Sequence, residues 1–444
     1  MNHYPCLSLL SLLAFSVLLV GCESPKQFRT NDQTSQQPNL TNSKYIVEET
    51  KDYTLGFVEF DDQGWLWNRK QIDAVTAKFS DELKTQGLLI VTFVHGWKHN
   101  ANSQDGNVQM IRKVLREIAQ MEQLLSEKEN RPSRRIAGVY IGWRGLSESV
   151  EPFKEISFWG RKNTAEVVGH GAVVELLATL ENLKAQSNRN ASGEIGDHKR
   201  MSTKLIIIGH SFGGDIVYSA TAPILAERMV EHFGDNGSLQ LPRSLGDMVV
   251  LINPAFEAAR FETIQRLAAT EKFPPGNNCT LAVFTSKTDD ATKVAFKIGR
   301  RVSTLFDSCR NAAQKTANIT AVGHYQPYIT YDLNVISSLP KEKLETTATN
   351  EASVPESTVT ILSLRDKRHL VTENATREEL TYRFTHCELL PRTNSVPNDP
   401  VFVVSVDPRI IPDHNAIDQG IFIRFLGEFL FAFSMASTGI DTCQ

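Results

Sequence analysis

Apolar residues along this chain alternate between short continuous runs and longer segments with helical spacing. The short runs, rich in Val, Ile and Leu, are typical of strands in a sheet that is covered on both faces. The segments between them place apolar residues three or four positions apart, as amphipathic helices do. The predicted strands are Tyr53–Phe60, Leu88–Val94, Arg135–Gly142, Lys204–Gly209, Asp247–Leu251, Thr280–Thr285 and Val401–Val406. The predicted helices are Asn68–Thr85, Val108–Lys128, Ala165–Ala185, a helix from Ser211 into Pro223, Phe256–Thr270 and Ile417–Ser437.

Two of these helices contain residues that qualify the pattern. Pro223 removes a backbone donor and should bend or end the helix that follows Ser211. Arg424 and Glu428 lie four positions apart in the last helix, which favours a packed amphipathic helix over a membrane span. The span from about 300 to 400 lacks the strand-helix rhythm, so it is interpreted as an insertion or cap before the last strand.

The N-terminal residues are interpreted as a targeting segment. Cys6 to Val20 is an apolar run that is too short for an ordinary transmembrane helix, so residues 1–21 fit a signal peptide. Leu19-Val20-Gly21-Cys22 resembles a bacterial lipobox. That resemblance implies that Cys22 is lipidated and anchors the protein to the bacterial envelope, on the periplasmic side or at the outer membrane. The alternative is a soluble secretory signal that ends in a cysteine.

The residues after Cys22 differ sharply in composition from the rest of the chain. Glu23 to Ser43 is rich in Gln, Asn, Ser and Thr, so residues 22–43 are expected to form a flexible tether. Residues 44–444 then form one domain. Of 444 residues, 41% are hydrophobic and 22% are charged, with a net charge of −4, which is an ordinary soluble composition. The absence of a strongly basic block argues against a nucleic-acid partner.

Of the six cysteines, Cys6 lies in the signal peptide and Cys22 would carry the lipid, which leaves four. Export would place them in an oxidising compartment, so at least one disulfide is expected. Three pairings are possible and remain open. The four cysteines are Cys279, Cys309, Cys387 and Cys443.

The stretch from Lys204 to Gly214 joins a predicted strand to a predicted helix and carries the motif G-x-S-x-G. The motif is Gly209-His210-Ser211-Phe212-Gly213. In this context the sharp turn exposes the serine hydroxyl, and the flanking glycines avoid a steric clash. The helix N-terminus that follows favours negative charge beside the serine. A simple Gly-Ser turn is the alternative interpretation.

The chain resembles the α/β-hydrolase superfamily, and within it the lipase and esterase branch. The resemblance rests on the motif around Ser211, on His95-Gly96-Trp97 after a predicted strand, and on the order of the elements, and it spans about Leu88 to Ser437. It implies a mostly parallel, doubly wound sheet with helices on both faces. It also implies an oxyanion hole formed by the N–H groups of Trp97 and Phe212, although a simple glycine turn would also explain Gly96.

The same fold places an acid and then a histidine on loops after later strands. Asp289 and Asp290 follow the strand Thr280–Thr285, and Asp289 is favoured as the acid. His414 lies between the last strand and the last helix and is favoured as the base. His324 remains the alternative base, and Asp290 remains the alternative acid.

These residues predict a serine hydrolase that cleaves small-molecule or lipid esters through an acyl-enzyme intermediate. No metal or cofactor is implied: His95 and His99 are four apart, but Gly96 interrupts the helix that a metal-binding pair would need. Two alternatives stay open. One is a non-catalytic envelope lipoprotein that keeps the fold for binding, and the other is a different acyl-transfer enzyme such as an amidase, peptidase or transacylase.

Overall fold

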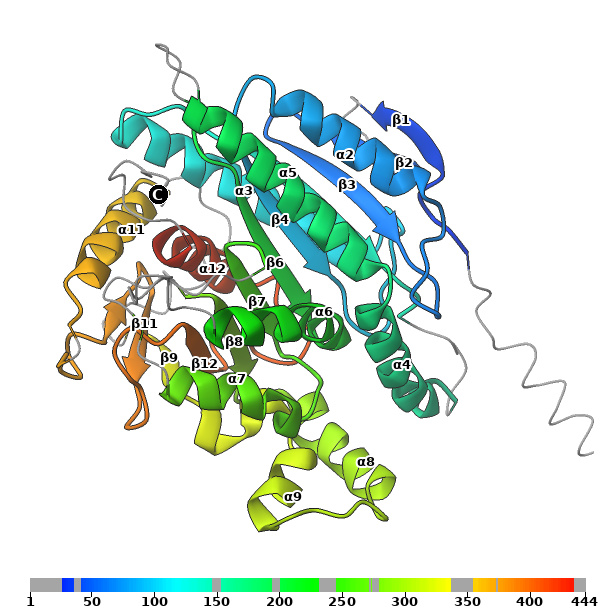
Figure 1. Ribbon diagram of the computed structural model, residues 1–444, viewed down its shortest axis with the longest axis vertical. Helices are drawn as coiled ribbons and strands as arrows, with labels where there is room; N and C mark the ends of the chain where they lie inside the picture. Colours follow the sequence, from blue (N-terminus) through cyan, green and yellow to red (C-terminus); the bar gives the residue numbers. More distant parts are fainter. Residues whose placement is uncertain are drawn as a thin grey trace, which may run out of the picture.

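The computed structural model describes residues 26–35, 41–145, 153–193, 200–230, 245–270, 273, 279–336, 354–372 and 374–434. These residues form an α/β fold around a twelve-stranded, mostly parallel mixed sheet (Figure 1). The strands are β1 (Asn31–Ser35), β2 (Tyr45–Glu49), β3 (Tyr53–Glu59), β4 (Leu88–Val94), β5 (Arg135–Gly142), β6 (Lys204–His210), β7 (Met248–Ile252), β8 (Leu281–Ser286), β9 (Tyr331–Val335), β10 (Tyr382–Arg383), β11 (Cys387–Pro391) and β12 (Val401–Val406).

Helices pack against the sheet and against one another. The α-helices are α2 (Lys70–Glu82), α3 (Gly106–Lys128), α4 (Phe153–His170), α5 (Val173–Gly193), α6 (Phe212–Val230), α7 (Ala258–Thr270), α8 (Phe296–Ser303), α9 (Ala312–Asn318), α11 (Val354–His369) and α12 (Gly420–Phe433). A π-helical turn, η1 (Ala291–Ala295), precedes α8, and two 3-10 turns, η2 (Val322–His324) and η3 (Gln326–Tyr328), precede β9.

The strand order is β1-β2-β3-β5-β4-β6-β7-β8-β12-β9-β11-β10. All pairings from β3 through β9 in this order are parallel, so these strands end at one common edge of the sheet. Antiparallel pairing is confined to the two sides of this block, between β2 and β3 and among β9, β11 and β10. Every residue of β4 is buried, as expected for a strand covered on both faces.

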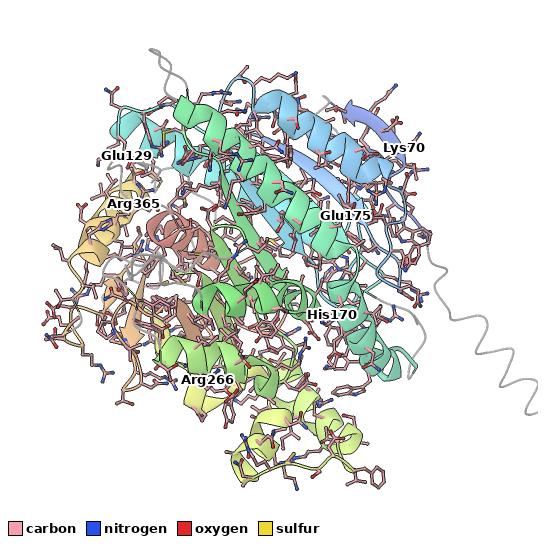
Figure 2. The ribbon with its side chains drawn as sticks, viewed as in Figure 1. Lys70, Glu129, His170, Glu175, Arg266 and Arg365 are labelled. Atoms are coloured by element: carbon pink, nitrogen blue, oxygen red, sulfur yellow. The ribbon has the colours of Figure 1, made fainter. Side chains whose placement is uncertain are left out.

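Two hydrophobic cores lie on opposite faces of the sheet. One core joins α2, α5, α6 and α7 to the sheet, and the other joins α3, α11 and α12 to it. The last helix was expected to be amphipathic, but all of α12 is buried because α3, α11 and the sheet surround it. Arg365 of α11 donates to Glu129 at the end of α3 over 2.7 Å and ties these two helices together (Figure 2).

The predicted helix Ala165–Ala185 is two helices in the structure. The chain breaks between α4 and α5 at Gly171, where a Cβ would lie 2.5 Å from the carbonyl oxygen of Gly64. Ala172 N–H donates to that same oxygen over 2.8 Å. The close approach of the two backbones therefore ends the first helix. By contrast, α6 continues through Pro223 to Val230.

Part of the span from 300 to 400 belongs to the sheet. β9 pairs with β12 in parallel, and β11 and β10 extend the same edge. β12 lies between β8 and β9 in the sheet. After β8 the chain therefore forms β9, β10 and β11 at the outer side of the sheet before it returns to place β12 beside β8. α11 packs beside α12 and α3 on one face.

Residues 26–35 pack against the domain, where the sequence suggested a flexible tether. β1 pairs in parallel with β2, and Arg29 is fully buried. The Arg29 guanidinium donates to Glu48 over 2.7 Å and stacks 3.5 Å from the ring centre of Phe57. The carboxylate of Glu59 accepts the N–H groups of Phe28 and Arg29 over 2.9 and 2.8 Å. The composition of this segment predicted a tether, because the segment is held mainly by a buried ion pair and by hydrogen bonds to distant residues, which composition does not reveal.

We expect Arg29→Ala to lower the free energy of unfolding by about 3 kcal/mol, because it leaves the buried Glu48 carboxylate with Arg112 as its remaining cation. Urea unfolding monitored by circular dichroism measures this loss. Arg69→Ala is the matched control, because the Arg69–Glu175 pair is exposed on both sides, and its unfolding midpoint should be nearly unchanged. Equal midpoints for wild type and Arg29→Ala would contradict a structural role for residues 26–35.

Candidate active site

Ser211 lies in the sharp turn between β6 and α6, at the carboxyl edge of the sheet. Its φ is +57°, a left-handed conformation that is uncommon for a residue with a side chain. Ser211 N–H donates to Ile252 O over 3.0 Å, and Ser211 O accepts the N–H of Ala255 over 3.1 Å. These bonds to the end of β7 hold the strained residue in place.

A continuous hydrogen-bonded chain runs from Ser211 to His414 and on to Asp289. The Nε2 atom of His414 lies 2.7 Å from Ser211 Oγ, and its Nδ1 atom lies 2.9 Å from Asp289 Oδ1. Ser211 follows β6, Asp289 follows β8 and His414 follows β12, so three parallel strands bring the three side chains to one edge. A serine hydroxyl bonded in this way can lose its proton to the imidazole as it attacks an electrophile.

The Asp289 carboxylate is buried and has further donors. Thr292 N–H donates to Oδ1 over 3.0 Å, and Thr292 Oγ1 donates to Oδ2. Burial raises the pKa of Asp289, but the charge of His414 and the hydrogen bonds from His414 and Thr292 outweigh it, so the pKa lies below its usual value. The side chain is therefore an anion that can hold the His414 ring in one tautomer.

The two alternative residues lie elsewhere. Asp290 is exposed to solvent. His324 lies behind the acid, where its Nε2 atom is 3.0 Å from Thr292 Oγ1, the same hydroxyl that donates to Asp289. The structure thus brings Asp289 and His414, rather than Asp290 and His324, to the serine.

The backbone of His414 is held by residues to which the sequence assigned no role. The carbonyl oxygen of His414 accepts a hydrogen bond from His210 Nε2 and another from Asn253 Nδ2, each over 2.9 Å. Asn253, at the end of β7, adopts a φ of +45° and also accepts the N–H of Ser286 over 2.9 Å. Ser286 Oγ in turn donates to Ile411 O over 2.6 Å. These bonds fix the loop that carries the imidazole.

The loop after β4 lies directly against the serine. A Cβ at Gly96 would be 2.7 Å from the Cβ of Ser211, so only glycine fits there. Trp143 N–H donates to His95 Nε2 over 3.1 Å, and its indole N–H donates to His95 O over 2.8 Å. Trp143 is therefore a buried residue that positions this loop, and it also lines the adjoining cavity.

The two predicted oxyanion donors come from this loop and from the turn. Phe212 is the first residue of α6, so its N–H has no acceptor within the helix. Beside Trp97, Lys98 N–H donates to Gly145 O over 3.3 Å and fixes the turn. The side chains of both donors contact Phe158, with ring centres 5.2 Å away for Trp97 and 4.7 Å away for Phe212. This contact joins the two donor segments through α4.

A cavity adjoins the loop on the side of β3 and β5. A Cβ at Gly145, in its wall, would lie 2.8 Å from Gly96 O, so the cavity borders the loop that follows β4. The cavity is lined by aromatic rings and polar groups, which include Phe28, Phe60, Trp67, His99, Trp143 and Arg144.

The predicted cysteines that the structure describes are not part of this site. Cys279, Cys309 and Cys387 have free thiols, so the described residues contain no disulfide. Cys443 and Cys22 lie outside the described residues. Within the part of the chain that the structure describes, no helix is both long and apolar enough to cross a membrane.

Comparisons with known proteins give little guidance. No protein-family model and no curated protein matches the chain. A crystal structure of an uncharacterized protein from Pseudomonas aeruginosa matches 53% of this chain and 42% of that chain, at 10% sequence identity and a TM-score of 0.21.

The two buried histidines near the site make stability depend on pH. Burial lowers the pKa of His210 to about 3 and that of His95 to about 4. In the unfolded chain a histidine takes up a proton below about pH 6.5. Between that pH and the folded pKa the unfolded state binds more protons, so stability falls as the pH falls. We expect each histidine to lower the free energy of unfolding by about 2 kcal/mol when the pH falls from 7 to 5.

Urea unfolding of wild type and His210→Gln at these two pH values measures this effect. The variant should lose about 2 kcal/mol less than wild type, because it lacks one of the two histidines. Burial raises the pKa of Asp399 to about 8. That carboxyl group therefore makes stability rise as the pH falls, and it does so equally in both proteins. The comparison therefore isolates His210, and equal losses in the two proteins would contradict its neutral, buried state.

Proposed function

We propose that this protein is a serine hydrolase of the α/β-hydrolase type that cleaves carboxylic esters through an acyl-enzyme intermediate. The observation that carries the proposal is the chain of contacts from Ser211 Oγ to His414 over 2.7 Å and from His414 to Asp289 over 2.9 Å. Geometry and roles, rather than sequence position, identify a catalytic triad.

The order of these residues supports the same assignment. Nucleophile, acid and base follow β6, β8 and β12, which is the order Ser, Asp, His of this superfamily. The turn after β6 combines a left-handed serine with close glycine neighbours, as a nucleophile elbow requires. A sheet with helices on both faces and loops at its carboxyl edge provides the corresponding scaffold.

In the proposed reaction Ser211 Oγ attacks the ester carbonyl carbon while its proton passes to Nε2 of His414. Asp289 stabilises the imidazolium that forms. The N–H groups of Trp97 and Phe212 donate to the oxyanion of the tetrahedral intermediate. His414 then returns the proton to the leaving alcohol, and the acyl group stays on Ser211. Water, activated by His414, hydrolyses the acyl-enzyme and restores the serine.

We expect the three side chains to act as one unit. Ser211→Ala should abolish both ester hydrolysis and labelling by a fluorophosphonate probe, because the nucleophile is gone. His414→Ala should lower kcat by a factor on the order of 10⁴. Hydrolysis of p-nitrophenyl esters of graded acyl length measures these losses and gives the acyl preference at the same time.

The two neighbouring aspartates provide a matched pair of variants. Asp289→Asn should also lower kcat by about 10⁴, because an amide favours the wrong imidazole tautomer. Asp290→Asn removes the same charge from an exposed position and should stay close to wild type. Near-normal turnover by a folded Asp289→Asn variant would refute the triad. A folded wild type that reacts with neither probe nor esters would favour the non-catalytic alternative, and probe labelling with turnover of amides alone would favour an amidase or peptidase.

We further propose that Cys22 is the lipidated first residue of the mature protein and anchors it to the bacterial envelope. The support is the lipobox-like Leu19-Val20-Gly21-Cys22 after an apolar run. A palmitate analogue should label the wild type during growth and leave Cys22→Ser unlabelled. Equal labelling of both proteins would place the lipid elsewhere. Ser211→Ala is the control here, because it keeps the anchor and should be labelled like the wild type.

A further inference from the structure

The turn η1, the helix α8 and the residues after it expose an unusual amount of apolar surface. The exposed fractions are 47% for Val294, 59% for Ile298, 73% for Val302, 72% for Leu305 and 97% for Phe306. Val294, Ile298 and Val302 are four positions apart, so they form one stripe along the helical segment. We call these five residues the apolar ridge. In Figure 1, α8 and α9 project from the lower end of the body.

The opposite side of α8 packs against the domain. Phe296 is fully buried and lies 5.9 Å from the ring centre of Trp159. A Cβ at Gly299 would overlap the indole of Trp159, which shows how closely the two helices approach. Arg300 pairs with Glu257 over 2.8 Å on this packed side. The segment is therefore fixed to the domain by one face, and the apolar ridge is on the other.

Basic residues accompany the ridge. Lys293, Lys297 and Arg301 each immediately precede a ridge residue, so a cationic stripe runs beside the apolar one. Besides Arg300, residues 291–318 contain five Lys or Arg and one acidic residue, Asp307, in a chain whose net charge is −4. Positive charge is thus concentrated around the exposed apolar surface.

We propose that this face docks on the surface of an anionic phospholipid bilayer. Apolar side chains beside a row of Lys and Arg are the features with which a helix lies in a membrane interface, with the apolar groups among the acyl chains and the cations at the phosphates. A second copy of this chain would bring an equally cationic segment against it, and the like charges would repel.

The docking face is connected to the candidate active site. η1 begins two residues after Asp289, and Thr292 within η1 donates to the Asp289 carboxylate. The bilayer contact would therefore lie at the edge of the sheet that carries Ser211 and His414. The proposal itself does not depend on catalysis, because it rests on the exposure and charge of the segment.

Site-specific photocrosslinking in the full chain tests this proposal. Phe306 is replaced by the photoreactive residue p-benzoylphenylalanine, and the protein is reconstituted on vesicles of phosphatidylglycerol or of phosphatidylcholine. Leu370, 76% exposed at the end of α11, carries the same probe in the control protein. We expect lipid adducts at position 306 on phosphatidylglycerol to exceed those on phosphatidylcholine, and those at position 370, on the order of tenfold. Raising the salt to about 1 M should remove this difference.

Charge reversal provides the second arm of the experiment. Lys297→Glu with Arg301→Glu should reduce the adducts at position 306 to the phosphatidylcholine level. Arg377→Glu with Arg383→Glu makes the same change in net charge at exposed positions outside the ridge and should have no effect. Thermal unfolding of each variant checks that it is folded. If the Lys297→Glu, Arg301→Glu protein does not fold, the proposal is decided by the lipid and salt comparisons made with the protein that keeps both cations.

Three results would overturn the proposal. The first is equal lipid adducts at positions 306 and 370, or none at either. The second is a crosslink at position 306 that joins two copies of the chain. The third is a dominant adduct with another protein when cells that export the probe-bearing chain are irradiated. None of these results bears on ester hydrolysis, so they leave the proposed function to its own test.

Discussion

The left-handed backbone of Ser211 is the constraint on which the site depends. A residue with a side chain adopts this conformation only when its surroundings hold it, here through hydrogen bonds to Ile252 and Ala255 at the end of β7. The tight turn also needs close backbone neighbours, since a Cβ at Gly213 would lie 2.1 Å from Val94 O. That approach seats the start of α6 against the end of β4. Ser211, the helix N-terminus and the loop with Trp97 are thereby fixed by one local geometry.

The central part of the fold could be predicted because each of its strands is a continuous apolar run. β4, β5, β6 and β12 agree with the expected ranges to within a residue, since burial on both faces leaves little freedom in their sequences. The strands at the two sides of the sheet could not be predicted in this way. β9 alternates buried and half-buried residues within a polar stretch, and β1 is a short polar strand held by its neighbours. The break between α4 and α5 depends on a contact with Gly64, far away in the sequence.

The same distinction applies to the candidate site: its local motifs could be predicted, and its contacts between distant residues could not. The motif around Ser211 and the order of the later loops were sufficient to name Asp289 and His414. Choosing between Asp289 and Asp290, or between His414 and His324, needed their positions in space. The supporting residues were invisible to sequence patterns, because Asn253 and His210 act on a carbonyl oxygen 161 and 204 residues further along the chain. An asparagine after a strand has no signature for such a distant partner.

The packing of residues 26–35 limits how far the domain could move from an anchor at Cys22. Phe28 and Arg29 bind Glu59, the last residue of β3, so the chain enters the domain at the carboxyl edge of the sheet, where Ser211 also lies. Lys26 lies four positions after Cys22, so the chain between them spans at most about 14 Å when fully extended. A lipid on Cys22 would therefore keep this edge of the sheet close to the bilayer surface. The domain would then stay at the membrane surface, and it could move only a short distance into the surrounding solution.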